Sequence, residues 1–349
     1  SPTSPASSTF MAFPPGDTGT WIRIISDRDL STASAVFTCR NRDDRNNEAT
    51  SVFTGLARPG ATFTAGLIRA RDNNKRTLSF AALAMDGSDL GYYELDAGLN
   101  LRRTDDQAAH EFTKTKAGMK DGVLQIDEAS ILYTDDSGRR WRLPKGDAAL
   151  DAHPLGSCRV AREVATERDL FNAHGTFYEL PARNAGGFSK LRPVATHNRL
   201  VHDFCSYRGL LVISGVTSEP EARNPHLIRS DDGRTALWAG AIDDLWQLGK
   251  PRGTGGPWKN SRVLAGQGSD PYLMTAYDRK TLTLMTDHAT TITAEVDITG
   301  EGHWIPYGKK FITVAGASTT YVFPEAFSAY WIRFTSTADC TATAVLRYE

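Results

Sequence analysis

Short strand-forming segments are the feature of this sequence that most limits its fold. Apolar and β-branched runs recur along the chain, for example at 20–26, 34–39, 62–70 and 210–214, and Gly, Asp and Asn turns separate them. Helical periodicity is nearly absent, and 160–171 is the one segment in which we expect a short helix. Regular short strands predict an all-β protein, built as a sandwich, a barrel or a propeller.

The organisation along the chain predicts more than one unit. Residues 1–15 are rich in Ser, Thr and Pro, which indicates a linker or a processed N-terminus and favours a secreted or extracytoplasmic location. We assign 16–268 to a β-propeller. Residues 269–349 alternate apolar and polar side chains over several short segments, which predicts an antiparallel β-sandwich-like domain or a closing propeller blade.

Charge and cysteine content exclude several classes of function. The 40 basic and 41 acidic residues nearly cancel, so nothing indicates nucleic acid as a partner. No apolar stretch is long enough to span a bilayer. The four cysteines are widely spaced without a CxxC pair, so we expect no zinc site. Pairing of Cys158 with Cys205 and the oligomeric state both stay open.

Groups able to bind anions or transfer protons are concentrated between residues 158 and 259. A planar guanidinium can hold a carboxylate through two hydrogen bonds, so clustered arginines are candidates for binding an acidic sugar. Imidazole and phenol groups near strand ends are candidates for acid–base catalysis. The substrate-binding candidates are Arg162, Arg168 and Arg208, and the catalytic candidates are His174, His197 and Tyr178.

The segment 240–259 supplies the second part of the predicted site. We expect a strand that ends in the paired acids Asp243 and Asp244, followed by a long Gly- and Pro-rich loop. Indole rings stack on sugar rings, and cationic side chains meet anionic substituents. The candidates in this loop are Trp246, Lys250, Arg252 and Trp258. We expect no cofactor; the paired acids leave open a structural calcium ion, although no EF-hand spacing is present.

One turn carries a resemblance to a known family. Thr134, Asp136, Gly138 and Trp141 follow the order of an Asp-box, in which Asp accepts turn amides, Gly takes a positive φ and Trp fills the gap between strands. A degenerate copy runs from 226 to 238. The sequence therefore resembles the sialidase-like β-propeller proteins that act on carbohydrates, a group that includes propeller lyases and hydrolases of rhamnose–glucuronate linkages.

The resemblance implies an exported enzyme that cleaves an acidic, uronate-containing oligo- or polysaccharide. As a polysaccharide lyase, the protein would hold the sugar carboxylate on arginine and transfer protons through histidine or tyrosine. As a glycoside hydrolase, it would need two carboxyl groups, drawn from a pool that includes Glu163, Glu179 and Asp243. The alternatives are a non-catalytic glycan-binding module and a structural propeller module.

Overall fold

The structure, a computed structural model, describes residues 51–70, 77–115, 122–157, 159–165, 168–197, 199–218, 224–325 and 327–349. The N-terminal tract, the strands expected at 20–26 and 34–39, and Cys158 lie outside these residues. The side chain of Arg168 lies outside them too. Within the described ranges the chain is all-β, which confirms the predicted fold class.

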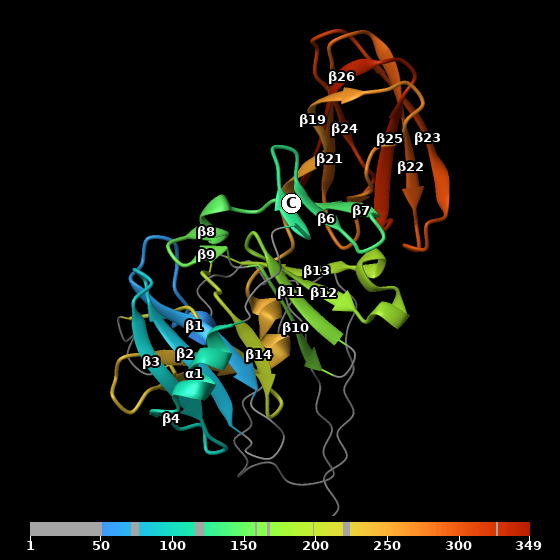
Figure 1. Cartoon of the computed structure of the whole chain (residues 1–349). Coiled ribbons are helices and arrows are strands. Elements are labelled where there is room, and N and C mark those ends of the chain that lie inside the picture. Colours follow the sequence, from blue (N-terminus) through green and yellow to red (C-terminus); the bar gives the residue numbers. More distant parts are fainter. Residues whose placement is uncertain are drawn as a thin grey trace, which may run out of the picture.

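Three antiparallel sheets with the size of propeller blades form one part of the molecule (Figure 1). The first joins β16 (Val216–Thr217), β1 (Phe63–Ala70), β2 (Leu78–Ala84), β3 (Asp89–Leu95) and β4 (Leu101–Arg103). The second joins β10 (Val160–Ala165), β11 (Arg168–Ala173), β12 (Thr176–Pro181) and β13 (Arg192–Thr196). The third joins β14 (Phe204–Tyr207), β15 (Leu210–Ile213), β18 (Ala236–Gly240) and β17 (Leu227–Arg229).

These sheets pack face to face, because alternate residues of their strands enter different cores. On β15, Leu211 and Ile213 pack towards the β10–β13 sheet, whereas Val212 packs towards the β1–β4 sheet. The β10–β13 sheet is likewise covered on both sides, with Leu170 in one core and Phe171 in the other. When both faces of a sheet are buried, its strand ends and connections are the parts that reach solvent.

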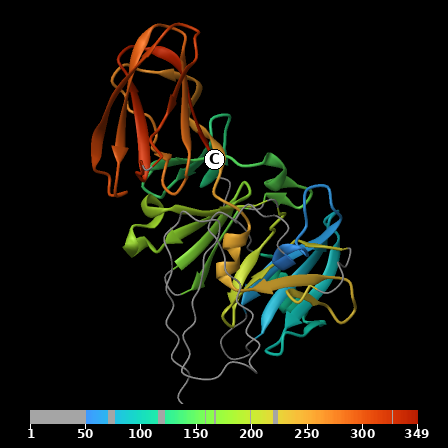
Figure 2. The same cartoon turned by 180° about the vertical axis from the view of Figure 1, so that it is seen from behind.

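The C-terminal part forms a β-sandwich, and the core of its two sheets continues into one face of the β10–β13 sheet. One sheet joins β19 (Gly253–Val263), β26 (Cys340–Tyr348), β21 (Lys280–Thr286) and β24 (Thr319–Val322). The other joins β23 (Trp304–Thr313), β22 (Thr290–Asp297), β25 (Trp331–Ser336), β20 (Tyr272–Leu273), β7 (Arg140–Leu143), β6 (Ile131–Thr134) and β5 (Leu124–Ile126). The sandwich thus includes β19, which lies before the expected boundary at residue 269, and three strands from 124–143. Both views show that the sandwich lies next to the β10–β13 sheet (Figures 1 and 2).

Short elements complete the described chain. They comprise helix α1 (Gln107–Lys114), the strands β8 (Ala152–His153) and β9 (Gly156–Ser157), and the 3-10 turns η2 (Ser51–Phe53), η3 (Ala148–Leu150), η4 (Arg183–Ala185), η5 (Gly187–Lys190) and η6 (Ile242–Gln247). Asp106 caps α1 by accepting the amide of Ala109. No helix of the described ranges is both long and apolar enough to cross a bilayer.

Two local predictions are wrong. The segment 160–171, expected to be helical, forms β10 and β11, because Val160, Arg162 and Leu170 share one face of a paired hairpin. The Gly-rich segment from 253 onwards is not a loop but the bulged strand β19. Its glycines permit close packing, since a Cβ at Gly256 would collide with the carbonyl oxygen of Ala344.

The segment that resembles an Asp-box forms a hairpin between β6 and β7. The aspartate that accepts the turn amides is not the one that the resemblance implies. Asp135, not Asp136, accepts the turn amides of Ser137 and Arg139, each at 2.9 Å. Asp136 is almost fully exposed and pairs with Arg183. Gly138 has the expected positive φ of 77°. The turn therefore keeps the glycine of the pattern that the sequence resembles, but not the aspartate that accepts its amides.

Candidate functional site

A basic cleft lies where the β-sandwich meets the blade-like sheets. It encloses about 990 Å³, and six basic side chains line it against four acidic ones. The basic residues are Lys145, Lys250, Arg252, Lys259, Arg279 and Arg347; the acidic ones are Glu128, Asp147, Asp278 and Glu349. Two of the acids form ion pairs with basic residues of the same cleft: Lys250 pairs with Asp278 at 3.3 Å, and Arg347 pairs with Glu349 at 2.6 Å. The cleft thus carries an excess of positive charge for an anionic ligand.

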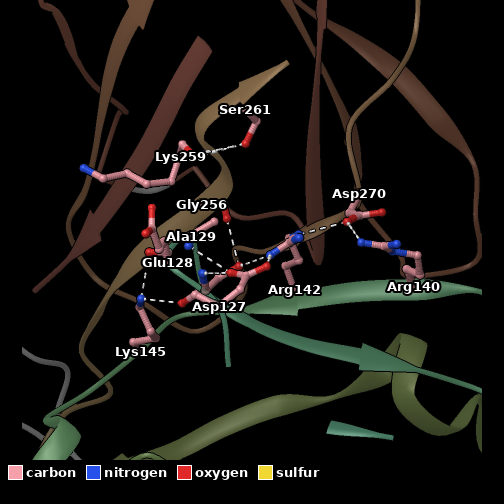
Figure 3. A network of polar contacts seen from close by, with 11 residues as sticks. Asp127, Glu128, Ala129, Arg140, Arg142, Lys145, Gly256, Lys259, Ser261 and Asp270 are labelled. Carbon is pink, nitrogen blue, oxygen red and sulfur yellow. Dashed lines mark hydrogen bonds and ion pairs between the residues drawn. The ribbon is translucent and has the colours of Figure 1, made fainter. Parts of the chain in front are cut away.

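A buried arginine holds one wall of the basic cleft (Figure 3). Arg142 on β7 contacts Asp127 at 2.8 Å and Asp270 at 2.9 Å, and it donates to Ser130 Oγ at 3.0 Å. Ser130 Oγ in turn donates to the carbonyl oxygen of Gly256 on β19. The turn that contains Asp127 is therefore fixed against the sandwich. Burial opposes ionisation of Asp127, but the Ser130 amide and the Arg142 guanidinium outweigh it and lower the pKa of this carboxyl.

Lysines of the cleft are placed in different ways. Lys145 donates to the backbone carbonyls of Asp127 and Glu128 at 2.9 and 2.8 Å, so its ammonium is fixed at the cleft wall. Lys259 on β19 is exposed, and Figure 3 shows its side chain extended with no contact drawn at the ammonium. Lys259 is therefore a cationic side chain of the cleft that is accessible to a ligand.

Thr196, at the end of β13, fixes the backbone of Arg252. Its Oγ1 accepts the Arg252 amide at 2.9 Å and contacts the Arg252 carbonyl oxygen at 3.1 Å. The Thr176 hydroxyl lies 3.0 Å from Thr196 Oγ1. Arg252 thus enters the cleft from a backbone held by the neighbouring sheet.

A second hollow, the tryptophan pocket, lies beside the β10–β13 sheet. It encloses about 470 Å³ and is lined by Trp246 of η6, a group of aliphatic side chains, and the polar residues Asp169, Glu179, Arg192 and Asp243. Trp246 is 55% exposed, so its ring is open to solvent. Glu179 and Arg192, neighbours across β12 and β13, pair at 2.6 Å. Burial, followed by the charge of Glu163, raises the pKa of Asp169.

Three of the residues selected from the sequence line these hollows. Lys250 and Arg252 line the basic cleft, and Trp246 lines the tryptophan pocket. Glu179 and Asp243, two acids of the hydrolase pool, also line the pocket. Asp244 has a structural contact instead, since it accepts the amide of Ala241 at 3.0 Å at the start of η6.

The proton-transfer candidates lie in the cores and line neither hollow. His197 is buried, its Nε2 lies 2.8 Å from Asn172 Oδ1, and burial together with the charge of Arg199 lowers its pKa to about 3. Tyr178 is completely buried, which raises the pKa of its phenol. His174 forms the turn between β11 and β12 with a φ of 51°, and burial lowers its pKa. Their position on a doubly covered sheet keeps them from a substrate.

The remaining candidates also have structural surroundings. Arg162 binds Asp203 through both carboxylate oxygens, at 3.1 and 2.9 Å, and Asp203 is fully buried. Arg208 is exposed, has a φ of 53° and forms the turn between β14 and β15. Trp258 is 6% exposed and packs on Phe334. These three residues line neither hollow.

Several residues of the hollows were not selected from the sequence. They are Lys145, Lys259, Arg279 and Arg347 in the cleft, and Asp169 and Arg192 in the pocket. They are spread over more than half of the chain, and each is a single charged residue in an ordinary strand or turn. No local spacing relates them. Only the position of Lys259, one residue after Trp258 in a segment already selected, offered a signal.

Comparisons with known proteins give weak similarity. No protein-family model and no curated protein sequence matches the chain. Among solved structures, a glycoside hydrolase family 43 arabinoxylan arabinofuranohydrolase from Bacillus subtilis matches with 11% identity and a TM-score of 0.21, over 83% of this chain and 79% of that chain. A family GH32 β-fructofuranosidase from Bombyx mori matches with 11% identity and a TM-score of 0.18, over 81% and 78%.

An exo-β-1,3-galactanase from Phanerochaete chrysosporium matches with 9% identity and a TM-score of 0.17, over 81% of this chain and 82% of that chain. All three are enzymes that act on carbohydrates. TM-scores of this size establish neither a common fold nor a common site. What the chain does has to be inferred from its own residues.

Proposed function

We propose that this protein is an exported carbohydrate-active protein that binds an acidic, uronate-containing saccharide in the basic cleft. The observation that supports this is the lining of the cleft, in which six basic side chains surround about 990 Å³. Carboxylates on a sugar chain form charge-assisted hydrogen bonds with lysine and arginine. The cleft is open to solvent, as a polymeric ligand requires.

Titration of the full chain with oligogalacturonate at low and high salt tests this proposal. Lys259→Ala is expected to weaken binding about three- to tenfold, or ~0.7–1.4 kcal/mol, because one exposed cation is lost. Lys310→Ala is the matched control, since Lys310 is also exposed on a strand of the sandwich but lies outside the cleft. Binding is expected to weaken as salt rises. Equal effects of the two substitutions, or no binding at low salt, would overturn the proposal.

Hydrolysis is the reaction that we propose for the bound saccharide, in the tryptophan pocket. Glycosidases use two carboxyl groups, one of which is an acid with a raised pKa. Glu179 and Asp243, which both line the pocket, are the two carboxyl groups that we propose for this reaction. The side chain of Asp169 lies on the opposite face of the sheet from Glu179, so we assign it no role. Proton transfer by His174, His197 or Tyr178 is not carried forward, because none of them lines a hollow.

The products distinguish the possible reactions. Hydrolysis gives new reducing ends without ultraviolet absorbance, whereas elimination gives an absorbing unsaturated uronate. We expect Asp243→Asn to abolish the release of reducing ends while leaving affinity unchanged, and Glu111→Gln, an exposed acid on α1, to change neither. Absorbing product would favour a lyase. Binding without any product would identify a glycan-binding module.

A further inference from the structure

The tryptophan pocket and the basic cleft share their dividing wall. Three separate segments each supply residues to both hollows. On β13, Val194 lines the pocket and Thr196 lines the cleft. In the connection to β19, Pro251 lines the pocket and Arg252 lines the cleft. The distance between Val194 and Thr196 along an extended strand is only about 7 Å, which a short oligosaccharide covers.

A third segment confirms that the two hollows adjoin. Ala276, with a φ of 61°, lines the pocket, and Asp278 and Arg279 line the cleft two and three residues later. A contact of 3.3 Å between Lys250 and Asp278 links this segment to the connection before β19. The wall between the hollows is therefore thin, and it is built from elements of both the blade-like part and the sandwich.

The chemistry of the two hollows differs. In the pocket, acidic residues outnumber the single arginine, so a ligand carboxylate is repelled there. An open indole ring and aliphatic side chains suit the C–H face of a sugar ring. The carboxylate of Glu179 and the guanidinium of Arg192 can meet neutral hydroxyl groups. The pocket is thus suited to an uncharged sugar, and the cleft to an acidic one.

We infer that the tryptophan pocket is a subsite for an uncharged sugar ring, placed so that the same glycan chain continues into the basic cleft. This inference rests on the function proposed for the cleft and extends it to the pocket. The ligand is then a chain that contains a neutral residue close to a uronate. Binding at one hollow raises the effective concentration of the chain at the other.

Three oligosaccharides test the inference by calorimetric titration of the full chain. They are oligogalacturonate, which carries only acidic residues, a cello-oligosaccharide, which carries none, and a glucuronoxylan oligosaccharide, which carries both. Trp246→Ala is expected to weaken binding of the mixed oligosaccharide about three- to tenfold and to leave oligogalacturonate unchanged. Trp246→Tyr is expected to restore most of the affinity, because the aromatic face is kept.

Phe112→Ala is the matched control, since Phe112 on α1 is 63% exposed and lines neither hollow. Salt separates the two contributions. Higher salt is expected to weaken binding of oligogalacturonate strongly. The fold-decrease in affinity for the mixed oligosaccharide that Trp246→Ala causes is expected to stay the same.

The outcomes separate the two proposals. If oligogalacturonate binds in the cleft but Trp246→Ala leaves the mixed oligosaccharide unaffected, the inference is overturned and the proposed function stands. If oligogalacturonate does not bind, while the cello-oligosaccharide binds in a manner that depends on Trp246, the proposed function is wrong. The inference that one glycan chain occupies both hollows is then overturned as well. Equal losses in Trp246→Ala and Phe112→Ala would also overturn the inference.

Discussion

Replacement of the buried Arg142 by methionine is expected to destabilise the protein by about 2–3 kcal/mol. The guanidinium, 8% exposed, holds two aspartates at 2.8 and 2.9 Å. Breaking a fully buried ion pair costs about 3–5 kcal/mol. Asp127 is 42% exposed and Asp270 is 23% exposed, so water recovers part of that loss when the arginine is removed. Methionine keeps the packing of the aliphatic stem.

Arg140 is the matched control, because it contacts the same carboxylate oxygen of Asp270. Its distance is 3.1 Å and its side chain is 48% exposed, so Arg140→Met is expected to cost less than about 1 kcal/mol. Urea unfolding at pH 7, followed by tryptophan fluorescence, gives both values from the midpoints and slopes. Equal losses for Arg142→Met and Arg140→Met would refute the argument that burial determines the cost.

Acid provides a second check on the Arg142 prediction. The pKa of Asp127 is lowered in the folded state, so its contribution to stability is present above about pH 3.9, the ordinary value, and is lost as the pH falls through the lowered value. The difference in unfolding free energy between the wild type and Arg142→Met is therefore expected to shrink as the pH falls from 5 to 2. A constant difference over that range would contradict the assignment of Arg142 as the partner of Asp127.

Further substitutions test other parts of the structure. Thr196→Val removes the contacts that fix Arg252, and we expect a loss of about 1 kcal/mol in urea unfolding and a severalfold weaker titration with oligogalacturonate. Asp203→Asn leaves a guanidinium without its charged partner and is expected to cost about 2–4 kcal/mol by the same unfolding assay. Gly256→Ala drives a Cβ into a carbonyl oxygen of β26, and we expect a loss above about 2 kcal/mol in thermal unfolding. His197 has a pKa of about 3 in the folded chain and near 6.5 when unfolded, so stability is lost as the pH falls through this window; in His197→Gln, urea midpoints are expected to vary less between pH 6.5 and 4.

The fold class could be predicted from the sequence because strand alternation is a local signal. Leu211, Val212 and Ile213 enter two different cores in turn, and their β-branched and apolar character marks a strand without knowledge of its partners. The prediction failed at 160–171, where charged residues interrupt the strand pattern. Pairing of Arg162 with Asp203, 41 residues away, explains how one of these charges is accommodated in a strand.

The candidate site could be predicted only in part, because burial is a property of the whole assembly. His197 and Tyr178 carry reactive groups, but they lie on a sheet that is covered on both faces. Trp246 and Arg252 line the two hollows, and both lie in the connection after β18 rather than within a strand. Arg142 and Asp270 are separated by 128 residues, so no sequence spacing could relate them.

The construction of the basic cleft indicates that little ordering is needed when a ligand binds. Lys145, two residues after β7, and Thr254 on β19 exchange two backbone hydrogen bonds of 2.9 Å. Thr196 fixes Arg252 from the opposite side, and the Lys145 ammonium is held by two carbonyls. Because side-chain and backbone ordering is a main cost of association, a cleft whose walls are already bonded can bind a flexible, weakly charged chain with few direct contacts. Lys259 is exposed with no contact drawn at its ammonium, so its side chain has to be ordered when a ligand binds, and its replacement by alanine tests one direct contact of the cleft.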